Sequence, residues 1–240
     1  MHSKHIFKSR EECAEHCAEH ILDRLRDTLK RHGFATIALS GGHTPKPMFA
    51  KLAAAGFDWS QVHFFWVDER CVPPESDESN FKLANQALLA PARIPATNIH
   101  RVKAELPPEE AAAGYVSDIQ RFFQLGSTEL PVFDVIHRGI GNDAHTASLF
   151  PGEPLIRDRT GIAAAIYVEK LKSHRVTLMP GVLLAARSTV IQAEGEDKAQ
   201  PIYSVLFGPE DPMQYPCQIA ARGSEKAVWF LDQAAASKLP

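Results

Sequence analysis

The stretch Ala35-Thr-Ile-Ala-Leu-Ser-Gly-Gly-His-Thr-Pro45 contains the pattern that decides the fold. Residues 35–39 are mostly apolar and predict a short buried strand, which stops at Ser40-Gly-Gly. Pro45 is favourable in the first turn of a helix, and the apolar spacing that follows predicts a helix over 45–55. A strand that passes through a glycine turn into a helix is the repeating unit of parallel sheets.

The same alternation continues along the chain. It predicts a single-domain α/β fold over 1–240, Rossmann-like, with a mostly parallel sheet and helices on both faces. In such sheets ligands bind beyond the carboxyl ends of the strands. The further predicted strands cover 62–67, 132–140, 163–168, 175–179, 189–193 and 227–231, and the further predicted helices cover 11–31, 79–89, 107–123, 146–150, 180–186 and 197–207.

Composition limits the function classes. The chain has 240 residues with 26 Lys and Arg against 29 Asp and Glu, so its net charge is −3, and 45% of its residues are hydrophobic. These proportions exclude a disordered, collagen-like or coiled-coil protein, and the charge argues against a nucleic-acid-binding surface.

No apolar run is long enough to cross a membrane, and the first residues lack the apolar core of a signal peptide. With only four cysteines, the expected location is the cytoplasm.

The glycine turn after the first predicted strand is a candidate anion site. Glycines let the backbone approach a ligand, and free N–H groups at a helix start attract phosphate. The alternative is a plain tight turn with a capping hydroxyl. The candidate binding residues here are Ser40, Gly41, Gly42, His43 and Thr44.

Charged residues follow two other predicted strands and open a third. Asp68-Glu69-Arg70 comes directly after 62–67, where Arg70 could bind a phosphate and Asp68 could orient it or a sugar hydroxyl. Lys198, after Gly195-Glu-Asp, could reach an anion, and Arg175 opens a further strand. Solvated loops and surface ion pairs are the alternative explanation for all of these charges.

The stretch Gly139-Ile-Gly-Asn-Asp-Ala-His-Thr146 contains the strongest catalytic candidates. His145 can act as a general base toward water, and Asp143 can fix its tautomer or bind substrate. A helix-capping or core histidine is the alternative. The glycines also match a dinucleotide-binding fingerprint, but that motif normally lies in the first strand–helix unit of a fold.

Cys13, His16, Cys17 and His20 share one stripe of the first predicted helix. A single straight helix cannot surround a zinc ion tetrahedrally, so we expect buried cysteines and histidines at the edge of the apolar face. No metal site is predicted.

Taken together, these motifs resemble those of the 6-phosphogluconolactonases, a family related to glucosamine-6-phosphate isomerases. The resemblance covers nearly the whole chain, and 143–152 is its most specific part. It implies hydrolysis of 6-phosphoglucono-δ-lactone without metal or organic cofactor, on a fold shared with glucosamine-6-phosphate deaminases. The motifs, in family order, are Ser40-Gly-Gly-His-Thr-Pro, Val67-Asp-Glu-Arg, Ser79-Asn, Asp143-Ala-His-Thr-Ala-Ser-Leu-Phe-Pro-Gly, Arg175-Val-Thr-Leu and Trp229-Phe-Leu-Asp.

Several residues depart from the family pattern. Ala144 stands where the family usually has glycine, which raises the question of a positive φ at that position. Arg138 introduces a charge into a strand that is usually apolar there, and a buried charge needs a partner. His43, Cys71 and His137 are further departures.

The expected mechanism is a direct attack of water on the lactone. His145 takes the proton of the water and returns it to the leaving oxygen, Asp143 orients substrate or imidazole, and backbone N–H groups stabilise the oxyanion. Arg70 and Lys198 are expected to bind the phosphate. The partner is a small sugar-phosphate lactone, and the protein is expected to be a monomer or small homo-oligomer. The alternatives are an aminosugar-phosphate deaminase or isomerase, a non-catalytic sugar-phosphate sensor, and a nucleotide-binding oxidoreductase.

Overall fold

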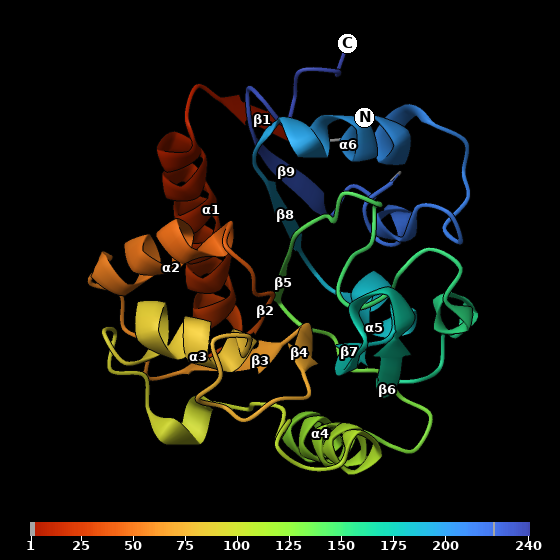
Figure 1. Ribbon diagram of the computed structural model, residues 1–240. Helices are drawn as coiled ribbons and strands as arrows, with labels where there is room; N and C mark the ends of the chain where they lie inside the picture. The colour runs from red at the N-terminus through yellow and green to blue at the C-terminus, as the bar shows by residue number, and fades with distance from the viewer. Residues whose placement is uncertain (1–2, 223) are drawn as a thin grey trace.

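The computed structural model describes residues 3–222 and 224–240, and a six-stranded sheet runs through it (Figure 1). Every neighbouring pair of strands in this sheet is parallel. The predicted α/β fold is therefore confirmed. In spatial order the strands are β1 (Ser3–Phe7), β9 (Ala227–Asp232), β8 (Thr189–Ala193), β5 (Val135–Arg138), β2 (Ala35–Leu39) and β3 (Val62–Trp66).

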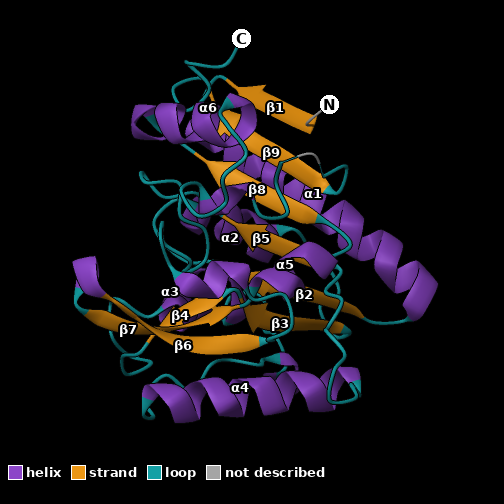
Figure 2. Ribbon diagram, turned by 90° about the vertical axis from the view of Figure 1, so that its right-hand side faces the viewer, coloured by secondary structure: helices purple, strands orange, loops and turns teal. Residues whose placement is uncertain are grey.

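A second, smaller sheet is antiparallel and lies beyond β3, as Figure 2 shows. Its order is β4 (Asp68–Arg70), β7 (Ser173–Leu178) and β6 (Ala163–Val168). Val67 joins the two sheets: its N–H donates to the Leu39 carbonyl in β2 (2.8 Å), and its carbonyl accepts from the Leu178 N–H in β7 (2.8 Å). The chain therefore leaves the large sheet at the point where the charged residues begin.

Helices cover both faces of the large sheet, with α1 and α2 on one face and α5 and α6 on the other (Figures 1 and 2). The helix α4 packs against β6 and β7 of the small sheet. The bounds are α1 (Arg10–His32), α2 (Pro45–Ala54), α3 (Asn80–Ala84, continued as a π-helical turn over Asn85–Leu89), α4 (Pro108–Phe123), α5 (Pro180–Ala185) and α6 (Ala199–Phe207).

The helix α1 shows how the sequence directs this packing. Ser9 caps its start by accepting from the Glu12 N–H (3.1 Å), and Gly33 ends it with a φ of +76°. Its apolar stripe packs on the sheet, and Cys13 and Cys17 are fully buried in it, as predicted. At the edge of the stripe His16 stacks on Phe7, with ring centroids 4.8 Å apart.

Three predictions at the level of single elements were incomplete or wrong. The edge strand β1 was missed, because its sequence Ser-Lys-His-Ile-Phe contains no apolar run. β4 forms a separate strand, whereas the sequence predicts only a strand end followed by three charged residues, with a solvated loop as the alternative. The predicted helix over 146–150 does not form: Ala147 has a φ of +52°, and Leu149 N–H closes a tight turn onto the Thr146 carbonyl (3.0 Å).

The described residues include no helix that is long and apolar enough to cross a membrane.

Candidate active site

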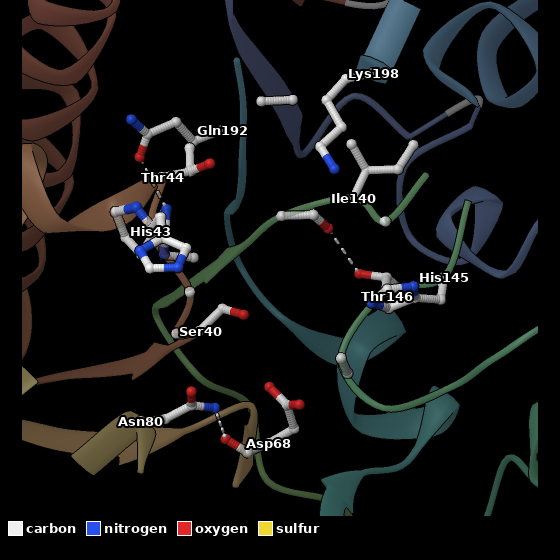
Figure 3. Close-up of a pocket in the computed structure, with 18 of the residues that line it drawn as sticks. Ser40, His43, Thr44, Asp68, Asn80, Ile140, His145, Thr146, Gln192 and Lys198 are labelled. Atoms are coloured by element: carbon white, nitrogen blue, oxygen red, sulfur yellow. Dashed lines mark hydrogen bonds between the residues drawn. The ribbon is translucent and has the colours of Figure 1, made fainter. Parts of the chain in front are cut away.

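A cavity of about 390 Å³ opens at the carboxyl ends of the central strands. All nine candidate binding residues and His145 line it, whereas Asp143 lies behind His145. Figure 3 shows Ser40, His43 and Thr44 on one side of the cavity, facing His145 and Thr146 on the other. The candidates, in chain order, are Ser40, Gly41, Gly42, His43, Thr44, Asp68, Arg70, Arg175 and Lys198.

His145 sits in a tight turn rather than at a helix start. The Nδ1–H of its ring donates to Asp143 Oδ1 (2.6 Å), and its backbone N–H donates to the same oxygen (3.1 Å). Because an ionised carboxylate only accepts, this bond fixes the tautomer and leaves Nε2 unprotonated. Ala144, between them, has a φ of +64°, so the position does require the left-handed conformation that glycine adopts more easily.

Gly141 is essential for the position of the imidazole. A Cβ at Gly141 would come within 1.9 Å of His145 Nδ1. On its other side the ring stacks on Phe150, with centroids 4.2 Å apart. The imidazole is therefore held between a glycine and an aromatic face.

Burial lowers the pKa of His145 to about 4. Among the neighbouring charges Asp68 acts in the opposite direction, whereas the cations Arg175, Lys198 and Arg70 lower the pKa further. The imidazole is therefore neutral at physiological pH and can accept a proton.

Arg70 and Arg175 lie directly opposite each other on the antiparallel strands β4 and β7. Opposite residues share one face, and two like charges there repel each other. The Nε atoms of both arginines are buried and have no partner among the described residues. The nearest carboxylate to Arg175 is that of Asp68, 3.9 Å from its guanidinium nitrogen, while Arg70 donates to the Glu78 carbonyl. This paired positive charge at the cavity is well suited to an anion.

Asp68 and Glu69 have different roles although they are adjacent. Asp68 lines the cavity and accepts from Ser148 Oγ (2.7 Å). Glu69 points the other way, where it accepts from the backbone N–H groups of Asn80 (2.8 Å) and Phe81 (2.7 Å) at the start of α3. Glu69 therefore fixes the start of α3 and is not part of the cavity wall.

The turn over 40–44 leads into α2, as the sequence predicts. Gly42 has a φ of +94°, and Gly41 packs so closely on Asn80 that a Cβ would meet its side chain at 1.9 Å. No acceptor among the described residues lies within reach of the backbone N–H groups of Gly42, His43 and Thr44. The helix start has no side-chain cap either, so these donors are free for a ligand.

Lys198 enters the cavity from the short 3-10 helix Glu196–Lys198, after β8. Its ammonium contacts Asn142 in the His145 turn and lies 3.1 Å from Asp197. It therefore joins the end of β8 to the turn that carries His145.

The structure also reveals a polar chain in the cavity wall that sequence reasoning missed. His137 Nε2–H donates to Gln192 Oε1 (3.3 Å), and Gln192 Nε2 donates to Glu194 Oε1 (2.8 Å). Burial lowers the pKa of His137 to about 4 and raises the pKa of Glu194 to about 7. His137 and Gln192 lie inside predicted strands that are mainly apolar, so a polar side chain within such a strand is the signal that could have identified them.

Arg138 is fully buried, and its partners are hydrogen-bond acceptors rather than a carboxylate. Its guanidinium donates to Thr146 Oγ1 (3.2 Å) and to the Ile219 carbonyl. Thr146 in turn donates to the Gly139 carbonyl (3.2 Å). Arg138 thus braces the turn that carries His145 from below.

Within residues 3–222 and 224–240, no group of three His, Cys, Asp or Glu side chains could hold a metal ion. His16 Nδ1–H donates to Glu19 Oε2 (2.8 Å), and His20 packs near Phe230.

Comparisons with known proteins identify the family to which the chain is similar. Residues 8–229 match the family described as glucosamine-6-phosphate isomerases/6-phosphogluconolactonase. A 6-phosphogluconolactonase from Synechocystis is 38% identical over 213 residues, which are 88% of this chain and 87% of that protein. The crystal structure of 6-phosphogluconolactonase from Thermotoga maritima is 29% identical and superposes with a TM-score of 0.83, covering 97% of this chain and all of the other.

A more distant structure shows how far the fold extends. A monomeric glucosamine-6-phosphate deaminase is 14% identical and has a TM-score of 0.82, over 98% of this chain and 99% of the other, so it shares the fold alone. The chain belongs to the glucosamine-6-phosphate isomerase/6-phosphogluconolactonase family, and its similarity lies with the 6-phosphogluconolactonases of that family.

Proposed function

We propose that this chain hydrolyses 6-phospho-D-glucono-1,5-lactone to 6-phospho-D-gluconate by a water attack that His145 assists. The observation that carries the mechanism is the neutral imidazole of His145, whose Nδ1–H is bound to Asp143 and whose ring lines a cavity rich in cations. The 6-phosphogluconolactonase activity itself follows from the family comparison.

His145 is the base of the proposed reaction. Nε2 takes a proton from water as the oxygen of that water forms a bond to the lactone carbonyl carbon. The imidazolium that results is stabilised by Asp143, as in other His–Asp pairs. The same proton then passes to the ring oxygen as its bond to the carbonyl carbon breaks, which regenerates neutral His145.

The carbonyl oxygen gains negative charge in the tetrahedral intermediate. Backbone N–H groups of the glycine turns are the proposed donors to it, because they are fixed before the reaction starts. Neither turn offers a serine nucleophile elbow, and no cysteine lies in the turn beside His145, so an acyl-enzyme is not part of this proposal.

The phosphate is proposed to bind to Arg70, Arg175 and Lys198, beside the free N–H groups of the 40–44 turn. Arg70 and Arg175 occupy opposite strand positions and repel each other, and an anion bound between or beside them offsets that repulsion. His43 and Asp68 complete this wall, with Asp68 available for a sugar hydroxyl. The phosphate lies far from the reacting carbon, so its binding serves to position the lactone.

The rest of the proposal concerns the molecule as a whole. We propose that residues 1–240 act as one domain, that the protein is a monomer or small homo-oligomer, and that it works in the cytoplasm on a small-molecule lactone.

The direct test is an assay on freshly generated 6-phosphogluconolactone, with the spontaneous hydrolysis measured in parallel and subtracted. We expect acceleration well above that background and no release of ammonia from glucosamine 6-phosphate. Ammonia release without lactone hydrolysis would favour the deaminase alternative. Tight binding of 6-phosphogluconate with neither reaction would favour a sugar-phosphate sensor.

A further inference from the structure

Lys170 lies at the tip of the β6–β7 hairpin, in the 3-10 turn Glu169–Leu171. The hairpin belongs to the small sheet, yet its tip reaches the turn that carries His145. The ammonium of Lys170 contacts Asp143 Oδ2, whereas Oδ1 of the same carboxylate receives the imidazole. The two oxygens of Asp143 therefore bind two different partners from two different parts of the chain.

The contact is part of a closed ring of four side chains. The Lys170 ammonium lies 4.5 Å from the centroid of the Phe150 ring, which is the ring that stacks on His145. A cation over an aromatic face is an attractive contact. The order around the ring is Lys170, Asp143, His145, Phe150 and back to Lys170. Lys170 therefore contacts both of the side chains that hold the imidazole.

We propose that Lys170 is a positioning residue for the reaction: it holds Asp143 in the orientation that His145 needs and offsets the negative charge of that carboxylate. This inference rests on the proposed role of His145 as the base. Lys170 acts through Asp143, and no contact of its own with the substrate is required.

Charges on both sides of the imidazole act on its proton affinity. Asp68 and Asp143 favour the protonated imidazole, and Arg70, Arg175 and Lys198 disfavour it. Lys170 binds Asp143 directly, and its positive charge offsets part of the negative charge by which Asp143 stabilises the protonated form of His145. Replacing Lys170 by a neutral side chain should therefore raise the pKa of His145. Because half of the Lys170 side chain is exposed to solvent (51%), the effect is modest and depends on salt.

The experiment compares wild type with Lys170→Met, Lys170→Arg and Lys172→Met. Lys172 lies in the same turn and is exposed, but it is not in the ring of contacts, so it controls for a general loss of surface charge. The pKa of His145 is measured by NMR titration of histidine-labelled protein at low ionic strength, with His145→Gln to assign the signal. The acid limb of kcat/KM is measured on the same variants.

In Lys170→Met we expect the His145 titration to move up by about half a pH unit, which is about a three-fold change in proton affinity. The acid limb of kcat/KM should move by the same amount, and KM should change less than two-fold. Lys170→Arg should restore the wild-type titration, and Lys172→Met should leave it unchanged.

Two results would overturn the inference: an unchanged His145 titration in Lys170→Met, or equal shifts in Lys170→Met and Lys172→Met. The NMR titration needs no turnover. An enzyme without lactonase activity whose His145 still responds to Lys170 would therefore refute the proposed function and leave the Lys170–Asp143–His145 linkage standing.

Discussion

Two glycine turns at neighbouring strand ends look alike in the sequence and differ in the structure. The 40–44 turn follows β2 and passes into α2, and its backbone N–H groups remain free among the described residues. The 139–146 turn follows β5 and passes into no helix. Its backbone is closed on itself by bonds from Gly141 N–H to the His145 carbonyl (2.9 Å) and from Ala144 N–H to the Gly141 carbonyl (2.9 Å).

The difference indicates that the two turns have different roles, one in binding and one in orienting a side chain. A turn with free donors at a helix start can bind an anion but leaves its own side chains loosely held. A turn whose backbone and side chains are satisfied internally can hold one imidazole in one orientation. We therefore expect changes around 139–146 to lower kcat. Changes at the cation wall, formed by Arg70, Arg175 and Lys198, should raise KM.

The largest expected effect comes from His145→Ala. Removing a general base lowers kcat by about 10²–10⁴-fold. The melting temperature should remain close to that of wild type, since the imidazole is at the cavity surface. His174→Ala is the matched control, because His174 is exposed on β7 and should not affect turnover. Near-wild-type kcat in His145→Ala would remove the base from the mechanism.

Gly141→Ala should have the next largest effect. Its Cβ would overlap the His145 ring, and a displacement of about 1 Å costs roughly 10²-fold in rate. Gly139→Ala is the control within the same turn, because the nearest atom to its Cβ would be the Gln192 carbonyl oxygen at 3.7 Å, an ordinary contact. Saturation kinetics should show the loss in kcat for Gly141→Ala only; equal losses in both variants would mean that the turn tolerates no side chain at all.

Arg70→Ala tests the cation wall. We expect KM to rise about ten-fold or more with a smaller change in kcat, as for a group that binds substrate and transition state equally. Arg24→Ala, on the far helix α1, removes a surface arginine of the same charge and should leave KM unchanged. If KM for Arg70→Ala equals that of wild type, Arg70 does not bind the phosphate.

The smallest predicted effect concerns Glu194. Its pKa is raised to about 7 by burial, so it is largely protonated at pH 6 and ionised at pH 8. The new negative charge should weaken the binding of an anionic substrate, and KM should rise about two- to five-fold over this range. In Glu194→Gln the rise should be smaller, while Glu196→Gln, an exposed neighbour, should follow wild type. A pH dependence of KM that is the same in all three proteins would show that the ionisation of Glu194 does not affect substrate binding.

The sequence was sufficient for five of the six strands of the large sheet, because those five are mainly apolar runs that end abruptly at glycine or charge; the edge strand β1 has no such run. It was insufficient for β4, since Asp-Glu-Arg forms a strand only where β7 is available to pair with it. It also failed at 146–150, where the hydrogen bonds of Ser148 to Thr177 and Asp68, in distant parts of the chain, outweigh local helix preference.

The candidate site shows the same limit. The candidate residues at strand ends could be named individually from the sequence, because a polar side chain at that position is seldom needed for the packing of the sheet. The partners of these residues could not be predicted. Lys170 reaches Asp143 from a hairpin tip, and Gln192 faces the cavity from inside a buried strand. Such contacts depend on how the two sheets meet, which local sequence does not encode.

His145 is proposed to work as a neutral base whose proton affinity is set by its buried position. The decisive measurement is the pH dependence of kcat/KM in wild type and in His145→Ala, because kcat/KM reports the free enzyme. We expect an acid limb near pH 4 in wild type that is absent from the residual activity of His145→Ala. A wild-type limb near 6.5, or the same limb in both proteins, would contradict it.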